Sequence, residues 1–168
     1  MGEIVPKRKV IKSREHAQIF LNSIPHSTLR NLIALVLCAP RNSLQLARVL
    51  GCSVCHAERL IRKFAERGII ESIKYKMWII LDIDENIKAE ITDGISAIVN
   101  FFKDHHDIPE EQTLKLLMEI LQLKGKPKIK LSGEIGVPSW ADHIYKELIK
   151  IMQKRRKELR EEKVIFAS

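Results

Sequence analysis

The chain has 168 residues, 45% of them hydrophobic and 30% charged, which is the composition of a globular protein with one well-filled domain or two small ones. Lys and Arg outnumber Asp and Glu by 29 to 21, so the formal net charge is +8. No stretch approaches the ~20 uninterrupted apolar residues that span a bilayer, and the N-terminus lacks the apolar segment of a secretory signal. We therefore expect a cytoplasmic protein without a membrane partner.

The excess positive charge is confined to the first half of the chain. Residues 1–83 contain 14 basic and 6 acidic residues, a net charge of +8, whereas residues 84–168 contain 15 of each. Charge gathered on one segment favours phosphate binding, because each neutralised phosphate releases condensed counterions. The alternative is a basic face that is simply solvated.

Residues 1–26 are predicted to form a basic arm and a short helix. Apolar side chains recur at helical spacing between Ser13 and Asn22. Two interpretations of the arm stay open, a segment that lies along a nucleic-acid groove or backbone and a disordered solubilising tail. The cations of the arm are Lys7, Arg8, Lys9, Lys12 and Arg14.

Two helices are predicted upstream of a central basic segment. The first is strongly apolar, runs from Ser27 to Cys38 and is broken before Pro40. The second is a short helix that Ser43 caps and that reaches Leu50.

A tight turn and a basic amphipathic helix follow between Gly51 and Gly68. Gly51 suits the positive φ of a sharp corner between helices, Ser53 suits the N-cap, and Gly68 suits the position after the helix end. One face of the predicted 53–67 helix is apolar, formed by Ala57, Leu60, Ile61 and Phe64. The opposite face is polar and basic, formed by Ser53, Cys55, His56, Arg59, Arg62, Lys63 and Arg67.

Residues 69–83 predict a short β-hairpin. The segments 69–73 and 77–83 are rich in β-branched and aromatic residues, and Lys74, Tyr75 and Lys76 lie between them as a basic tip. Such a tip is placed to touch phosphate or a minor groove beside the preceding helix.

The order of helix, helix, basic helix and two-stranded hairpin over residues 27–83 resembles the winged helix-turn-helix domains of prokaryotic and archaeal regulators such as the MarR and ArsR groups. The resemblance implies that the 53–67 helix enters the major groove of double-stranded DNA. The residues that match exposed recognition-helix positions are Ser53, Val54, Cys55, Glu58, Arg59 and Arg62, and Lys74 and Lys76 match the wing tip. Arg59 and Arg62 are expected to contact bases, since arginine can fork onto guanine. The side chains that would mainly hold phosphates are Ser53, His56, Lys63, Lys74 and Lys76.

Cys52 and Cys55, followed by His56, have the spacing of a metal or redox site, and ArsR-type sensors place thiolates near this part of the fold. A closed zinc site needs four ligands, however, and the third cysteine, Cys38, lies on an apolar helix where packing is expected. Three cysteines are also an odd number for a disulfide framework. We therefore predict no metal, no disulfide and no cofactor.

Residues 84–104 are predicted to form a linking helix with a wide apolar stripe. In a small winged-helix protein such a stripe commonly pairs with its copy, which predicts a homodimer through the 84–104 helix with reading helices ~34 Å apart. The alternative is packing against the chain's own C-terminal region. The stripe consists of Ile87, Ile91, Ile95, Ile98, Phe101 and Phe102.

Residues 105–168 are predicted to form a helical C-terminal domain. A polar break at 104–107 precedes Pro109, which starts a helix to about Leu123, and a long helix runs from about Ser139 to Glu161. Gly136 lies in a turn like that at Gly51, so a second helix-turn-helix is one interpretation. A helical assembly domain is the other.

The predicted fold class is mainly α, a winged helix-turn-helix of three helices and a two-stranded wing with an additional helical C-terminal region. We predict no catalytic residue and no enzyme, since the sequence has no phosphate-cradling glycine loop, zinc-hydrolase spacing or nucleophile turn. We predict a nucleoid-associated protein that binds double-stranded DNA as a sequence-specific transcriptional regulator. The alternatives are a replication, plasmid-partition or chromosome-organising factor with the same winged helix, and a winged helix that binds protein in a transcription or replication assembly.

Overall fold

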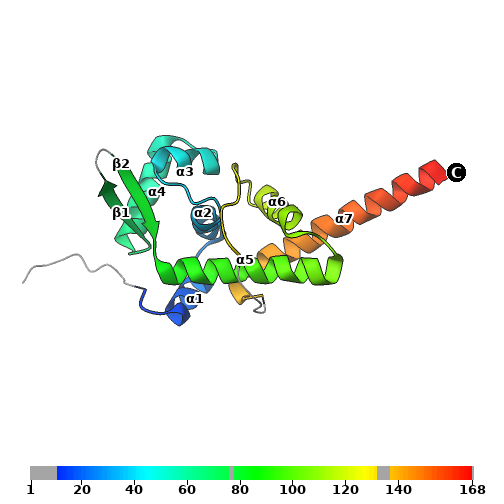
Figure 1. The fold of residues 1–168 in the computed structure, drawn as a ribbon, viewed down its shortest axis with the longest axis horizontal. Helices are drawn as coiled ribbons and strands as arrows, with labels where there is room; N and C mark the ends of the chain where they lie inside the picture. Colours follow the sequence, from blue (N-terminus) through cyan, green and yellow to red (C-terminus); the bar gives the residue numbers. More distant parts are fainter. Residues whose placement is uncertain (1–10, 76–77, 132–136, 168) are drawn as a thin grey trace, which may run out of the picture.

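A computed structural model of the chain describes residues 11–75, 78–131 and 137–167 (Figure 1). The described backbone is mainly helical with one antiparallel sheet of two strands, which confirms the predicted mainly α class. Among these residues no helix combines the length and the apolarity that a bilayer crossing needs. In chain order the elements are α1 Arg14–Ser23, α2 His26–Leu37, α3 Ser43–Leu50, α4 Val54–Glu66, β1 Ile70–Tyr75, β2 Trp78–Ile83, α5 Glu85–His106, α6 Glu110–Ile120, the short 3-10 helix η1 Ser139–Ala141, and α7 Asp142–Ala167.

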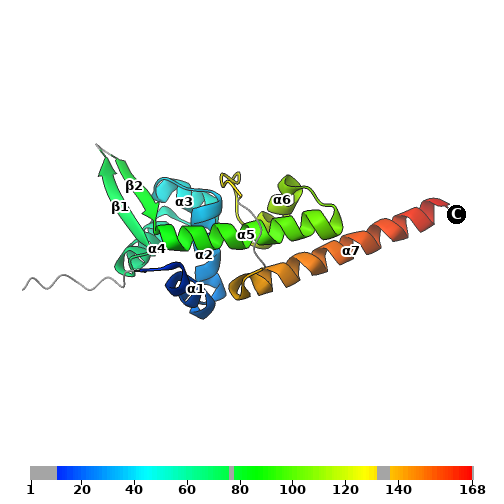
Figure 2. The same cartoon turned by 60° about the horizontal axis from the view of Figure 1, so that its bottom comes forward.

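Helix α5 is the central helix, against which α1, α2 and α6 pack (Figures 1 and 2). Asp84 caps its start, where the carboxylate accepts a hydrogen bond from the Ile87 amide at 2.9 Å. Asp107 ends it in the left-handed conformation, with φ 54°. Helices α1, α2 and α6 all contact α5, so its apolar side chains form the middle of the core.

Most of the apolar stripe of α5 is buried. Ile87, Ile91, Ile95 and Ile98 are at most 1% exposed, and Phe102 is equally buried. These side chains are covered by the chain itself, whereas Phe101 of the same stripe is only partly buried. A homodimer through the 84–104 helix stays a prediction. The alternative was packing against the chain's own C-terminal region, and α6 of that region does contact α5, as do α1 and α2 from the N-terminal side.

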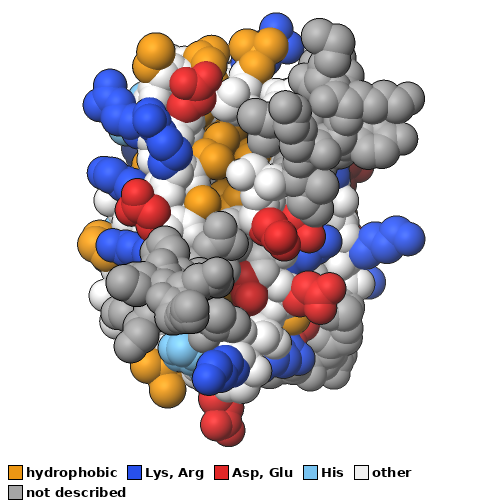
Figure 3. Space-filling model, turned by 90° about the vertical axis from the view of Figure 1, so that its left-hand side faces the viewer, with side chains coloured by type: hydrophobic (Ala, Val, Ile, Leu, Met, Phe, Trp, Pro, Cys, Tyr) orange, Lys and Arg blue, Asp and Glu red, His pale blue; other side chains and the backbone are white. Residues whose placement is uncertain are grey.

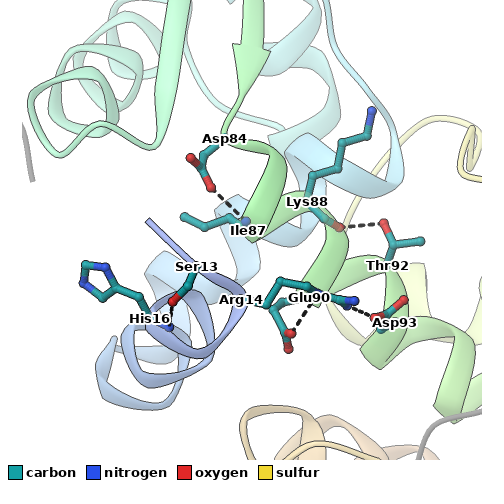
Figure 4. A network of polar contacts seen from close by, with 9 residues as sticks. All are labelled: Ser13, Arg14, His16, Asp84, Ile87, Lys88, Glu90, Thr92 and Asp93. Carbon is teal, nitrogen blue, oxygen red and sulfur yellow. Dashed lines mark hydrogen bonds and ion pairs between the residues drawn. The ribbon is translucent and has the colours of Figure 1, made fainter. Parts of the chain in front are cut away.

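Helix α1 is fixed to α5 by both polar and apolar contacts (Figure 4). Ser13 caps α1, and Arg14 forms ion pairs with Glu90, at 3.2 Å from Nε to Oε1, and with Asp93. Ala17 and Leu21 are buried beneath. The sequence analysis placed Arg14 in a basic arm, but its side chain is bound to α5. Lys7, Arg8 and Lys9 lie outside the described residues.

The predicted positions of helices α2, α3 and α4 agree with the structure to within a few residues. Gly51 takes the left-handed conformation at φ 68° between α3 and α4, and Gly68 does so at φ 76° after α4. The Ser53 hydroxyl accepts a hydrogen bond from the His56 amide at 3.1 Å, which confirms the predicted cap. The cap of α3 is Asn42 rather than Ser43, which becomes the first helical residue.

The strand ends differ from the prediction: β1 ends at Tyr75 rather than at residue 73, and β2 begins at Trp78 rather than at residue 77. β1 and β2 pair from Ile70 with Ile83 to Tyr75 with Trp78, so Lys74 lies in the strand opposite Ile79 and not in the turn. Lys76 lies outside the described residues. The Leu81 amide donates to the Arg41 carbonyl at 3.0 Å, which joins β2 to the segment before α3.

Arg30 on α2 ties together the ends of two other helices. Its Nη2 donates to the carbonyl oxygens of Leu50, at 3.2 Å, and Gln122, at 2.9 Å, and its Nε donates to the Leu121 carbonyl at 2.5 Å. The last carbonyls of a helix have no partner within it, so one guanidinium satisfies such groups at the ends of α3 and α6.

The C-terminal region differs from the prediction at two places. His105 and His106 belong to the last turn of α5 rather than to a polar break, and the His105 ring stacks on Phe101 with centroids 4.0 Å apart. Residues 124–131 form no helix, so a second helix-turn-helix lacks the helix that would precede its turn. Gly136 itself lies outside the described residues.

Helix α7 begins against the core and ends away from it (Figures 1 and 2). Ile144, Leu148 and Met152 are buried, whereas residues 153–161 are exposed. Arg155 pairs with Glu119 of α6 at 3.0 Å. One end of the molecule carries α4 and the hairpin. The far part of α7 therefore projects from the other end.

Candidate nucleic-acid interface

Helix α4 presents a polar, basic face to solvent. Ala57 and Phe64 are buried against the core, with Leu60 and Ile61 partly buried beside them, and this apolar face fixes the rotation of the helix. The predicted DNA-contacting residues of this helix and its N-cap are all exposed: Ser53, Cys55, His56, Arg59, Arg62 and Lys63.

Two of the α4 cations, Arg59 and Arg62, share a stripe with Cys55. Cys55, Arg59 and Arg62 stand at positions i, i+4 and i+7, so their Cβ atoms are neighbours about 5–6 Å apart along the helix. With 13 residues, α4 is ~20 Å long, and Arg59 lies at the middle of its exposed face. This geometry is the one in which a helix can enter the major groove of a duplex.

Within the part of the chain that the structure describes, Arg59, Arg62 and Lys63 form no ion pair. Two exposed glutamates, Glu58 and Glu66, share the helix, so the face is basic without being uniformly so. An unpaired guanidinium keeps all its N–H donors for an external acceptor.

The cap of α4 leaves donors at the start of the helix. The Ser53 oxygen accepts from the His56 amide, so its hydroxyl proton stays available to a phosphate. The first amides of a helix also carry partial positive charge. The exposed Ser53, Cys55 and His56 therefore surround a positive helix end.

Figure 3 shows the end of the molecule on which α4 and the hairpin lie. Lys and Arg side chains gather at its upper left with an acidic side chain beside them, and both signs of charge are mixed over the rest of the face. Of the two lysines predicted at the hairpin tip, the structure describes only the backbone of Lys74. A phosphate-holding role for Lys74 and Lys76 thus stays a prediction.

The cysteines differ in their surroundings. Cys38 is buried, Cys52 is half-buried against the core, and Cys55 is exposed, and all three thiols are free. Burial raises the pKa of the Cys38 thiol, and the positive charge of Lys128 opposes part of that rise. Across the described ranges, no group of three or more His, Cys, Asp or Glu side chains is arranged to hold a metal ion.

A lysine-rich loop lies beside α3, a neighbour that the sequence analysis did not foresee. The Lys124 amide donates to the Val49 carbonyl at 2.9 Å, and the Lys128 amide donates to the Leu37 carbonyl at 2.7 Å. One signal was present in the sequence, since residues 16–57 and 120–133 contain no Asp or Glu. Nothing in the sequence showed that these two acid-free segments would meet.

Comparison of this chain with known protein families, curated proteins and solved structures finds no match. Any function must therefore be argued from the geometry and charge of the chain's own residues.

Proposed function

We propose that residues 27–83 form a winged helix and that the protein binds double-stranded DNA with α4 in the major groove. The observation that carries the proposal is the division of α4 into two faces. Ala57 and Phe64 are buried, whereas Arg59, Arg62 and Lys63 are exposed without an ion pair among the described residues. Arg59 and Arg62 reach base edges, and Ser53, His56 and Lys63 hold phosphates.

The surrounding elements support this proposal. The turn at Gly51 brings α3 and α4 into contact, and the hydrogen bond from Leu81 to Arg41 holds the hairpin beside α3. This order of three helices and a hairpin, joined by these contacts, supports the proposal of a winged helix. The net charge of +8 on residues 1–83 supplies the electrostatic attraction to a duplex.

The proposed role is that of a sequence-specific transcriptional regulator. To test it, duplexes selected from genomic DNA would be compared with a random duplex by fluorescence anisotropy over a salt series. We expect tighter binding to the selected duplexes, and Arg59→Ala to cost about 1–3 kcal/mol there while costing less on the random duplex. Equal losses on both duplexes would remove the base-reading role and favour a replication, partition or chromosome-organising factor.

A second candidate function is favoured by two exposed apolar side chains. Leu44 on α3 is 48% exposed and Val54 on α4 is 38% exposed, and both helices belong to the proposed DNA-reading unit. A winged helix that docks on another protein would use such side chains. Absence of duplex binding at low salt would turn the proposal toward this protein-binding function.

A further inference from the structure

We propose that the loop of residues 124–130 and Arg48 of α3 form a second basic surface, which binds the backbone phosphates of the same duplex beside α4. We name it the loop–α3 surface and define it by Arg48, Lys124, Lys126, Lys128 and Lys130. The proposal rests on the proposed DNA binding and extends it to a part of the chain that lies far from α4 in sequence.

The loop displays its lysines on one side. From Lys126 to Leu131 the residues alternate between exposed and partly buried, and the partly buried Ile129 and Leu131 pack against the core. Alternation with a period of two is the mark of an extended backbone, in which side chains i and i+2 share a face about 6.6 Å apart. Lys126, Lys128 and Lys130 therefore form a row of cations rather than a scattered set.

The row is fixed to the DNA-reading unit by backbone contacts. The amides of Lys124 and Lys128 donate hydrogen bonds to the carbonyls of Val49 and Leu37. Arg30 also holds the segment that leads into the loop, through the carbonyls of Leu121 and Gln122. These bonds place the loop against the C-terminal ends of α2 and α3. A row held by main-chain bonds is ordered before the duplex arrives, which lowers the entropic cost of binding.

The side chains converge on one hollow beside α3. A cavity of about 240 Å³ is lined by Arg48, Lys124, Lys126 and Lys128, together with Cys38 and Gln45 and without any carboxylate. No ion pair neutralises these four cations within the described ranges. Four uncompensated positive charges around one concave surface attract anions and raise their local concentration.

The surface is continuous with the start of α4. The side chain of Lys124 lies beside the α3–α4 turn, since a Cβ built on Gly51 would stand 3.8 Å from its Cε and 3.9 Å from its Nζ. A duplex that contacts the first turn of α4 therefore has phosphates within reach of Lys124. A phosphate backbone is favoured over a single small anion because the cations extend in a row away from α4.

Acidic residues bound the loop–α3 surface on the side of the loop that faces α6. Lys126 also lines a larger cavity between the loop and α6, and that cavity carries Glu110, Glu111 and Glu119. Carboxylates repel phosphate, so the duplex lies on the α3 side of the loop and not on the α6 side.

The experiment measures the salt dependence of duplex binding by the full chain. In the loop variant Lys124, Lys126, Lys128 and Lys130 are each replaced by Gln. The matched control removes the same number of charges from α7. In it Gln replaces four exposed lysines, Lys146, Lys150, Lys154 and Lys157. Arg59→Ala/Arg62→Ala serves as the α4 variant, and circular dichroism confirms that every variant is folded.

We expect the loop variant to reduce the slope of log Kd against log salt by about 2–4, because each phosphate neutralised contributes about 0.9 to that slope. The α7 control should keep the slope of the parent. A loop variant that behaves like the α7 control while the α4 variant binds weakly would overturn this proposal and leave the proposed function standing. No binding by the parent at low salt would overturn both.

A second experiment distinguishes a site for a duplex from a site for a small anion. Calorimetric titration with inorganic phosphate would be run on the parent and on the loop variant. If the loop variant loses phosphate binding while its duplex slope equals that of the α7 control, the hollow is a small-anion site and the proposal is wrong. If both the phosphate binding and the slope fall, the surface binds phosphate within the duplex.

Discussion

Trp140 packs the edge of its indole ring directly against the backbone of Gly94. A Cβ built on Gly94 would lie 2.2 Å from Cζ2 and 2.6 Å from Cη2 of the ring, which no real contact allows. Trp140 is 5% exposed, and its indole N–H is buried without a hydrogen-bond partner among the described residues. Glycine in the middle of α5 is therefore required by the ring that η1 brings to it.

We expect Gly94→Ala to destabilise the protein by about 1–2 kcal/mol in urea unfolding. Alanine in place of glycine favours a helix by up to ~1 kcal/mol, but overpacking a rigid ring costs about 1–3 kcal/mol or more. In a Trp140→Leu background the space is free, so the same Gly94→Ala change should be neutral or stabilising. An equal loss in both backgrounds would show that the ring is not the cause.

Arg30 should be worth more to stability than an exposed arginine. We expect Arg30→Met to lower the free energy of unfolding by about 2–3 kcal/mol, because carbonyls at the ends of α3 and α6 lose their charged donor. Arg30→Lys should recover little, since an ammonium cannot reproduce the fork. Arg48→Met, on the exposed side of α3, is the matched control and should change stability by less than ~0.5 kcal/mol. Similar losses for Arg30 and Arg48 would contradict the helix-end role.

Stability should fall in mild acid through His106. Burial lowers the pKa of His106 below its ordinary value of about 6.5, and the charges of Arg156 and His105 add to the effect. The neutral ring accepts a hydrogen bond from Arg156, at 3.2 Å from Nη2 to Nδ1. Above pH 6.5 both states are neutral at this site, whereas at lower pH the unfolded chain takes up the proton first, so the folded state loses stability.

The check is the melting temperature at pH 7.5 and 5.5. We expect the melting temperature of the parent to fall more from pH 7.5 to pH 5.5 than that of the His106→Gln variant. The variant at the exposed His16, His16→Gln, should behave as the parent. A His106→Gln profile that is as steep as the parent's would assign the acid sensitivity to other groups.

The three cysteines offer a footprint of the α4 face. Cys55 is exposed, so an alkylating reagent should modify it first, and Cys38 should react last because burial shields it and raises its pKa. A bound duplex should slow the modification of Cys55 several-fold without changing the rate at Cys38. Peptide mass mapping reads both rates in one sample. An unchanged rate at Cys55 with saturating duplex would place the DNA elsewhere.

The local chemistry of the central segment was readable from the sequence. Gly51, Ser53 and Gly68 each act within a few residues, through a positive φ or a cap, so their roles needed no knowledge of the rest of the chain. The cap of α3 was misassigned by one residue because Asn42 and Ser43 are both good capping residues and stand next to each other.

Long-range packing was not readable in the same way. The spacing of Ile87, Ile91, Ile95 and Ile98 shows that one face of α5 is buried, but periodicity does not say which surface covers it. The covering helices come from both sides of α5 in the chain, including α1, whose Arg14 pairs with Glu90. The contact between the 124–130 loop and α3 could not be predicted from the sequence for the same reason.

The most direct measurement is the affinity of the full chain for duplex DNA at low salt, by fluorescence anisotropy, with and without the α4 cations. We expect the parent to bind, and Arg59→Ala/Arg62→Ala to bind at least tenfold more weakly, whereas the exposed α7 pair Lys150→Ala/Lys154→Ala keeps the parent affinity within about twofold. A parent that fails to bind, or an α4 variant that binds no worse than the α7 pair, would contradict a DNA-reading α4.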